Sequence, residues 1–380
     1  MKAARLHLLS EEKRLLWHLR TKGPMPRTEL ALSLQVSNSA LTKLSHKLIS
    51  LGLVEERAAP EAPEAPEAPA RGRPTIPLGI SAQGGFAAGA TMHMGVLEIA
   101  LVDFAGGIIA LEREQVGAPD PLEFAAILEE RINALCVRHR LLGMRFLGIG
   151  VGVPGAPTTR HGELWHTVKE LPGWRNVPLR QLFDDALGTS VLLENDANAA
   201  GLAEYYLGGA ARRASTVVVI VLGYGIGAGV IEDGRLIKGE FGGAGEIGRL
   251  YPGDLPRPST LDLLSMLRQA GCPIGSVANF EALTQDYDHV IDAWLDRAAG
   301  QLEPLVNGAI AWFDPDDIVF SSPLPVSVVM RLAGRLNARP LCWPEERPRG
   351  QVRVSALGGS AIALGAALLP IHAATALVFQ

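Results

Sequence analysis

The sequence predicts a small N-terminal head made of short helices, followed by a much larger α/β body. Over residues 1–57 apolar residues recur at helical spacing, whereas from residue 80 short apolar strands alternate with helices, an order that favours mostly parallel sheets. The charge changes with the pattern: residues 1–57 hold ten Lys or Arg and five Asp or Glu, a net charge of +5, although the whole chain carries −5. A basic head on an acidic body suits contact between the head alone and a phosphate backbone.

The length and composition fit two or three domains with cores of their own, since the chain has 380 residues of which 48% are hydrophobic. Cys136, Cys272 and Cys342 are odd in number and far apart, so we expect small buried side chains and no disulfide framework. The N-terminus lacks the apolar core of a signal peptide, and no run reaches the roughly 18 apolar residues of a membrane span. We therefore expect a cytoplasmic protein with no membrane partner.

Three helices are predicted in the head. The first covers residues 11–20, and the second is capped by Thr28. A tight turn at 35–37 leads to a third helix, which Ser37 or Asn38 caps and whose apolar face carries Leu41, Leu44, Leu48 and Leu51. Two helices joined by a short turn form the helix-turn-helix pattern.

The third helix also carries a polar face. Its side chains, with those of the preceding turn, can reach base edges and phosphates in a DNA major groove. The candidate DNA contacts are Ser37, Asn38, Ser39, Thr42, Lys43, His46 and Lys47. Double-stranded operator DNA is therefore an expected partner.

Two strands after the third helix predict a wing. Gly52 ends the helix, residues 53–57 begin one strand, and residues 71–78 form the returning strand. Together with the three helices they complete a winged helix-turn-helix domain, which we assign to residues 1–79.

The tip of the predicted wing has an unusual composition. Glu-Ala-Pro occurs three times at 61–69, and proline at every third position favours an extended polyproline II segment. A neutral expansion of a linker is the alternative interpretation of the repeat. Acidic residues repel phosphate, so Arg71 and Arg73, just after the repeat, are the better candidates for backbone or minor-groove contact.

From residue 80 the predicted strands are short apolar runs bounded by turn residues. Two strands are expected within 86–104, before a turn near 105–107, and others at 146–153, 191–194, 216–222 and 317–321. The expected helices cover 121–140 and 197–207, long segments within 260–313, and a last one near 360–369.

Four motifs follow one another in the body: Gly-Ile-Gly-Val-Gly-Val-Pro-Gly at 148–155, Leu-Glu-Asn-Asp-Ala-Asn-Ala at 193–199, Gly-Ile-Gly-Ala-Gly at 225–229 and Gly-Ala-Gly-Glu-Ile-Gly at 243–248. Over about residues 80–380 this series closely resembles the ROK family (repressors, open reading frames and kinases). The resemblance implies the two-lobed actin-like, ribonuclease-H-like fold of sugar kinases, with lobes at about 80–195 plus 355–380 and at 196–354. The head resembles the winged helix-turn-helix that the family's repressors carry and its kinases lack.

The resemblance also implies a sugar site. Asp196 matches the base that removes the proton from a sugar hydroxyl in family kinases, and Glu246 matches a carboxylate that accepts hydrogen bonds from further ring hydroxyls. Asn195 can both donate to and accept from neighbouring hydroxyls. The alternative for Asn195 and Asp196 is that they cap the helix that follows.

Three departures from the kinase pattern predict that phosphoryl transfer is lost. The phosphate-binding positions that hold an Asp and two glycines in family kinases are Thr91, His93 and Met94 here. Tyr224 replaces the family's Thr before Gly-Ile-Gly, and the glycine-rich loop expected at 321–325 contains two prolines, which lack a backbone donor. We therefore expect no enzyme activity, an inactive Asp196 and no cofactor.

The zinc site of the family is degenerate as well. Arg249 stands where the family has a histidine ligand, and residues 250–260 contain no cysteine, so no metal is expected. Asp262 falls near a family Glu that touches the sugar but is one methylene shorter. His161, His166 and His289 show no metal-ligand spacing.

Arg249 allows two interpretations. It can bind a ligand, and beside Glu246 and Asp262 it would then favour an acidic or phosphorylated sugar. Alternatively it pairs with those two carboxylates and fills the site.

These features predict a DNA-binding transcriptional regulator, a repressor that a sugar or sugar derivative releases. A homodimer or a dimer of dimers is expected, because one recognition helix reads too few bases for operator specificity. A regulator whose body serves only as a dimerisation scaffold is the main alternative, and a sugar kinase with a regulatory head is the weaker one.

Overall fold

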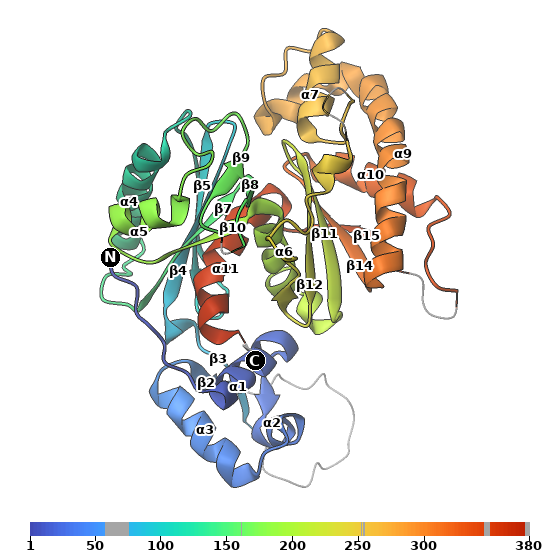
Figure 1. Ribbon diagram of the computed structural model, residues 1–380. Coiled ribbons are helices and arrows are strands. Elements are labelled where there is room, and N and C mark those ends of the chain that lie inside the picture. Colours follow the sequence, from blue (N-terminus) through green and yellow to red (C-terminus); the bar gives the residue numbers. More distant parts are fainter. Residues whose placement is uncertain (58–75, 161, 252, 254, 346–349, 377–380) are drawn as a thin grey trace.

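The computed structural model describes residues 1–57, 76–160, 162–251, 253, 255–345 and 350–376. The Glu-Ala-Pro repeat at 61–69, Arg71, Arg73 and His161 lie outside the described residues. Figure 1 shows the head at one end of the molecule and two sheet-containing lobes side by side on top of it.

The head consists of α1 (Ser10–Lys22), α2 (Arg27–Leu34) and α3 (Asn38–Ser50), with an antiparallel sheet of β1 (Met25–Pro26), β3 (Pro77–Ile80) and β2 (Val54–Glu56) in that order. The Ser37 hydroxyl accepts a hydrogen bond from the Ala40 amide at 3.2 Å, so Ser37 is confirmed as the cap of α3. The predicted cap at Thr28 is wrong, because α2 already begins at Arg27, directly after Pro26.

The first lobe is built on a five-stranded sheet in the order β10-β7-β4-β5-β6. β4 (Phe86–His93), β7 (Phe146–Val153) and β10 (Val191–Asn195) run parallel, whereas β5 (Val96–Asp103) and β6 (Ile108–Gln115) are antiparallel to their neighbours. α4 (Pro121–Arg138) and α5 (Leu179–Leu187) cover its outer face (Figure 1), and the short pair β8 (Gly155–Pro157) and β9 (Trp165–Thr167) lies beyond β7.

The two-residue turn between β4 and β5 holds Met94 at φ +49° and Gly95 at φ +77°. Two positive φ angles are typical of a type I′ turn, for which Asn-Gly is the preferred pair. Since a left-handed conformation costs most residues about 1–2 kcal/mol and asparagine less, we expect Met94→Asn to stabilise the protein by about 0.5–1 kcal/mol. The Met94 side chain is 47% exposed, so little packing is lost.

Urea unfolding measures this effect as a higher midpoint for Met94→Asn. Met330→Asn is the matched control, because Met330 is also exposed but lies within a helix, α10 (Val326–Asn337), where asparagine is a weaker helix former. An unchanged or lower midpoint for Met94→Asn would contradict the prediction.

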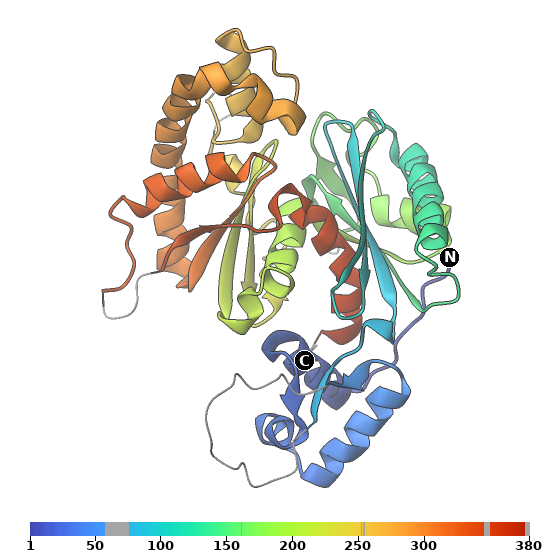
Figure 2. The ribbon, with the colours of Figure 1, turned by 180° about the vertical axis from the view of Figure 1, so that it is seen from behind.

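The second lobe contains a sheet in the order β13-β12-β11-β14-β15, and helices cover the face that points away from the first lobe (Figure 2). Its strands are β11 (Thr216–Leu222), β12 (Ile226–Glu232), β13 (Arg235–Leu236), β14 (Asp317–Ser321) and β15 (Val352–Val354). Its helices are α7 (Thr260–Gln269), α8 (Phe280–Leu283), α9 (Asp288–Phe313) and α10. Cys136 in α4 and Cys272 after α7 are buried as expected, whereas Cys342 is exposed, contrary to the prediction.

Two helices, α6 (Asp196–Tyr206) and α11 (Ala361–Thr375), lie between the sheets of the two lobes (Figures 1 and 2). They pack unusually closely, because a Cβ atom at Gly365 of α11 would lie 1.7 Å from the Ala199 carbonyl oxygen of α6. The segment Gly358–Thr375 is long and apolar enough to cross a membrane, which the sequence analysis did not anticipate. However, 72% of this segment is buried inside the protein, as in the core helix of a globular fold.

The head is packed against the body through two arginines. The Arg20 guanidinium of α1 donates to the Phe104 carbonyl at 2.8 Å and lies over the rings of Phe104 and Tyr206, at 5.2 and 6.0 Å from their centroids. Arg145 donates to the Leu51 carbonyl just after α3, at 3.1 and 3.2 Å. Apolar residues of the head and of α6 and α11 belong to one continuous core.

Candidate functional site

The second motif of the sequence forms the junction between β10 and α6. The Asn195 side-chain oxygen accepts hydrogen bonds from the Ala197 and Asn198 amides at 2.8 and 3.1 Å, so Asn195 is the cap of α6. Its side-chain nitrogen donates to the Gly155 carbonyl at 2.8 Å and to Glu246 Oε1 at 3.1 Å. Asn195 therefore both caps the helix and ties together three of the four motifs.

Asp196, at the start of α6, and Glu246, after β13, lie close enough for their charges to interact. Burial raises the pKa of Asp196 to about 6, and hydrogen bonds from the backbone only partly oppose this effect. Burial also raises the pKa of Glu246, the negative charge of Asp196 raises it further, and the charges of Arg249 and His166 lower it. Two carboxylates with raised pKa values make an acceptor-rich site that suits hydroxyl groups better than anions.

Asp262 does not pair with Arg249. Its Oδ2 atom accepts a hydrogen bond from the Trp294 indole at 2.7 Å and forms an ion pair with Arg297 of α9. Arg249 is exposed, and within the described part of the chain it forms no ion pair with Asp262. The interpretation in which Arg249 pairs with both carboxylates is therefore wrong for Asp262, which is engaged inside the second lobe.

An ion pair that was not predicted from the sequence holds the site together. Glu194 is buried, its Oε1 accepts hydrogen bonds from the Asn195 amide and the Asn198 side chain, and its Oε2 lies 2.5 Å from Lys238 Nζ. Lys238 belongs to the loop that leads to Glu246. Glu194 stands inside the motif at 193–199, so the motif itself was the available signal.

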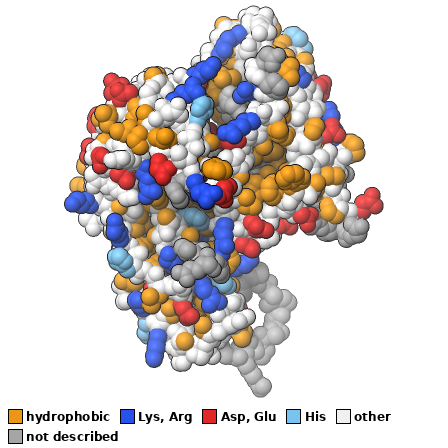
Figure 3. All heavy atoms as spheres, viewed as in Figure 1, with side chains coloured by type: hydrophobic (Ala, Val, Ile, Leu, Met, Phe, Trp, Pro, Cys, Tyr) orange, Lys and Arg blue, Asp and Glu red, His pale blue; other side chains and the backbone are white. Residues whose placement is uncertain are grey.

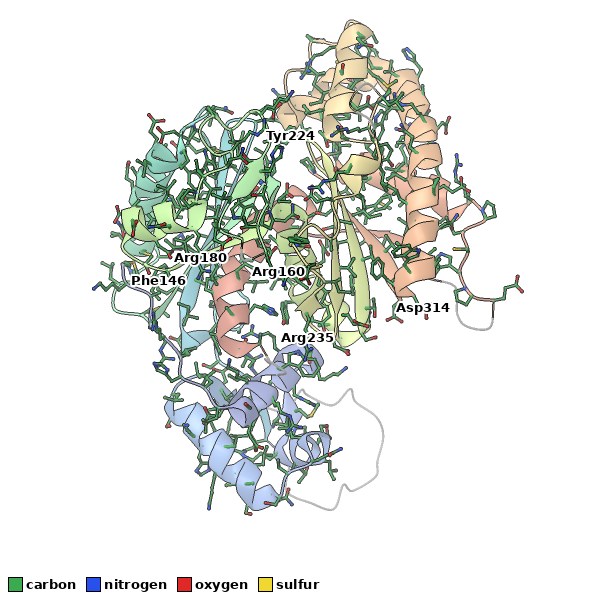
Figure 4. All side chains as sticks on the ribbon, viewed as in Figure 1. Phe146, Arg160, Arg180, Tyr224, Arg235 and Asp314 are labelled. Carbon is green, nitrogen blue, oxygen red and sulfur yellow. The ribbon has the colours of Figure 1, made fainter. Side chains whose placement is uncertain are left out.

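A second contact fixes the same loop from outside. Arg160, from the first lobe, forms an ion pair with Glu240 and lies over the Phe241 ring at 5.9 Å (Figure 4). The first part of the loop that carries Glu246 is thus held against the first lobe by two contacts, at Lys238 and at Glu240 with Phe241.

The predicted DNA-contact face of α3 is exposed at every position: Ser37, Asn38, Ser39, Thr42, Lys43, His46 and Lys47. On the visible face of the head, basic side chains outnumber acidic ones (Figure 3). Lys47 has an additional role, because its amine pairs with the buried Glu12 of α1 and so links α3 to the rest of the head. Thr42 donates back to the Asn38 carbonyl at 2.8 Å.

Among the residues that the structure describes, no group of three or more His, Cys, Asp or Glu side chains is placed to hold a metal ion. The sequence argument for a degenerate zinc site, based on Arg249 and the missing cysteines, stays a prediction.

Comparison with known proteins identifies the family. The family model described as "ROK family" matches residues 88–274. A protein of Sinorhizobium fredii, described as uncharacterized protein y4fQ, is 31% identical over 96% of this chain and 91% of its own length. The chain belongs to the ROK family.

Other ROK relatives include repressors and kinases. The DNA-binding transcriptional repressor Mlc of Escherichia coli is 27% identical over 60% of this chain and 54% of its own length, and the xylose repressor of Caldicellulosiruptor bescii is 28% identical over 58% and 53%. The match thus spans about half the length of these repressors. The crystal structure of a ROK family transcriptional regulator, described as a homologue of the Escherichia coli MLC protein, superposes with a TM-score of 0.69 over 97% of both chains at 22% identity.

A ROK family glucokinase from Streptomyces griseus, in complex with glucose and AMPPNP, superposes with a TM-score of 0.59 over 75% of this chain and 99% of its own, at 24% identity. These two structures confirm the predicted fold class: a helix-turn-helix head followed by the two-lobed actin-like fold.

The positions at which the sequence is expected to depart from the kinase pattern make contacts within this protein. The buried Thr91 hydroxyl donates to the Gly152 carbonyl at 2.9 Å, and the His93 ring stacks on Tyr224 with centroids 6.0 Å apart. In the loop at 321–325, the Ser322 hydroxyl donates to the Leu222 carbonyl at 2.7 Å. The side chains of Thr91, His93 and Ser322 are therefore engaged in contacts within the protein.

Proposed function

We propose that this protein is a cytoplasmic DNA-binding transcriptional regulator of the ROK repressor type, controlled by a sugar or sugar derivative and without kinase activity. The observation that carries the proposal is the head: a helix-turn-helix whose second helix, α3, exposes a continuous polar face while its leucines are packed inward. The repressors among its relatives support this assignment.

The exposed face of α3 has the chemistry for groove recognition. Lys43 and His46 lie one turn apart on the helix, and Ser39 lies one turn before Lys43. Cationic and hydroxyl side chains in this arrangement can contact phosphates at the groove edge and bases inside it. We propose that two heads of a homodimer, or of a dimer of dimers, bind the two halves of a palindromic operator.

The double variant Lys43→Ala, His46→Ala is expected to weaken operator binding by at least about thirtyfold, because it removes two groove contacts worth about 1–3 kcal/mol each. The operator would first be selected from random duplexes with the wild-type protein, and binding then measured by fluorescence anisotropy at fixed salt. Lys22→Ala, on the exposed end of α1, is the matched control. Wild-type affinity in the double variant would show that α3 does not read DNA.

The body supplies the site for control. Asn195 ends β10 in the sheet of the first lobe, whereas Glu246 follows β12 and β13 of the second, so a ligand that binds both residues would change how far the lobes close. The ligand alters DNA binding only if it binds one closure state more tightly than the other. His93, Tyr224 and the loop at 321–325 argue against phosphoryl transfer, and incubation with Mg-ATP and glucose is expected to yield no ADP.

Two observations favour a second candidate, a regulator that uses the body only as a dimerisation scaffold. The Asn195 amide already makes four hydrogen bonds within the protein, and Asp262 is paired with Arg297. A thermal-shift series with sugars separates the candidates, because a ligand at a hundred times its dissociation constant stabilises a protein by about 2.7 kcal/mol. A scaffold that binds no sugar would show no shift.

A further inference from the structure

His93 ends strand β4 of the first lobe and points at the start of α6. Its Nε2 atom is shielded from solvent and has no hydrogen-bond partner among the described residues, although it lies 3.7 Å from Asp196 Oδ2. A buried polar atom without a partner costs about 1–3 kcal/mol, so a structure retains one only where something else compensates. Burial lowers the pKa of His93 to about 4, and the imidazole is therefore neutral at pH 7.

Tyr224 reaches the same place from the second lobe. It stands in the turn between β11 and β12, and its ring stacks on His93 with an interplanar angle of 25°. Figure 4 shows Tyr224 between the two lobes. Three elements therefore converge here: β4 with His93, α6 with Asp196, and the β11–β12 turn with Tyr224.

The spacing between His93 and Asp196 suits one hydroxyl group. An oxygen atom can lie within about 2.8 Å of both Nε2 and Oδ2, because the two atoms are too far apart to bond directly but close enough to share a partner. A hydroxyl has one donor and two acceptor sites. It can donate to the Asp196 carboxylate and accept from the His93 ring, with the imidazole proton on Nε2.

A phosphate ester at the same place would lie against the negative charge of Asp196. Asp196 is a carboxylate and His93 is neutral. The guanidinium of Arg113, on β6, lies 3.1 Å from Glu98 and donates to the Ser360 hydroxyl at 2.9 Å.

We propose that His93 is a ligand-binding residue that holds, together with Asp196, one hydroxyl of an uncharged sugar. With Tyr224 it closes the side of the site where the phosphate loops of ROK kinases lie. The ligand class is thus a free sugar, and the ester phosphorylated at that hydroxyl is excluded. This inference rests on the proposed control by a sugar and adds to it the residue and the charge of the ligand.

Isothermal titration of the full-length protein tests the proposal with a panel of free aldohexoses and aldopentoses and their terminal phosphate esters, including glucose and glucose 6-phosphate. The expected result is that the wild type binds a free sugar and not its ester, and that His93→Phe weakens this binding at least tenfold. Phenylalanine keeps the stacked ring and removes both nitrogens. His289→Phe, at an exposed position of α9, is the matched control.

Asp196→Asn distinguishes the two ways in which the proposal can fail. If Asp196→Asn loses the sugar but His93→Phe binds it as the wild type does, the sugar site stands and the role of His93 is overturned. If the ester binds as well as the free sugar, the ligand class is overturned. If no member of the panel binds, both this inference and control by a sugar are overturned, whereas DNA binding by the head is untouched.

A measurement on the wild type tests the contact even if His93→Phe does not fold. The His93 imidazole nitrogens, observed by NMR in protein labelled with ¹⁵N-histidine, are expected to shift when the bound free sugar saturates the site. An unchanged His93 resonance at saturation would overturn the contact even if the variant cannot be purified.

Discussion

Gly365→Ala is expected to lower the free energy of unfolding by about 3 kcal/mol, near the upper end of the usual cost of overpacking a core. The added Cβ atom would lie 1.7 Å from the Ala199 carbonyl oxygen and 2.3 Å from the carbonyl carbon. Both contacts are with backbone, so α6 and α11 must move apart, and no side-chain rotation can relieve the clash. Differential scanning calorimetry would measure the effect as a lower Tm.

Gly308→Ala is the control for this change. Gly308 lies within α9, and a Cβ atom there would have no neighbour within 4 Å. Alanine is the better helix former by about 0.5–1 kcal/mol, so this variant is expected to be as stable as the wild type or more so. Equal stability of the two variants would mean that the helices between the lobes adjust without cost.

Arg20→Met is expected to destabilise the attachment of the head by about 1.5–3 kcal/mol, the usual contribution of a hydrogen bond to a charged group. Methionine keeps the apolar stem against the Phe104 ring but cannot donate to the Phe104 carbonyl. Faster hydrogen exchange is expected in residues 1–57, with little change in the sheet of the second lobe.

Lys22→Met serves as the control for Arg20→Met, because Lys22 lies on the same helix with its side chain in solvent. If residues 1–57 exchange at the same rate in Arg20→Met and in Lys22→Met, the Arg20 contacts do not hold the head. An increase throughout the chain would instead show that head and body unfold as one unit.

Sequence periodicity predicted the buried strands well. The bounds expected for β7, β11 and β14 match the structure, because each strand has a short apolar centre and is followed by turn residues. β6 was missed: most of its residues are at least partly exposed, and its second half, Leu-Glu-Arg-Glu-Gln, lacks the apolar pattern of a strand. The predicted end of the last helix before Pro370 was also wrong. α11 continues to Thr375, since its packing between the two sheets outweighs the hydrogen bond that proline removes.

The site was predictable as far as the motifs reached. The motifs predicted that Asn195, Asp196 and Glu246 belong to one site. In the structure Asn195 donates a hydrogen bond to Glu246. Asp262 could not be assigned from sequence, because its partner Arg297 lies 35 residues further along and on another helix. The contact between His93 and Tyr224 depends on how the two lobes pack together. A local sequence pattern cannot predict that packing.

The contacts of Arg20 and Arg145 have a consequence for engineering hybrid regulators. The head is joined to the body by donors that reach across the seam in both directions: Arg20 from the head to the body backbone, and Arg145 from the body to the head backbone. In a recombinant protein that carries this body under a foreign head, the Phe104 carbonyl would lose its donor Arg20, and Arg145 would lose its acceptor at Leu51. Joining the two domains at the right point of the chain is therefore not enough. A working hybrid must also keep Arg20 with the Phe104 carbonyl and Arg145 with the Leu51 carbonyl.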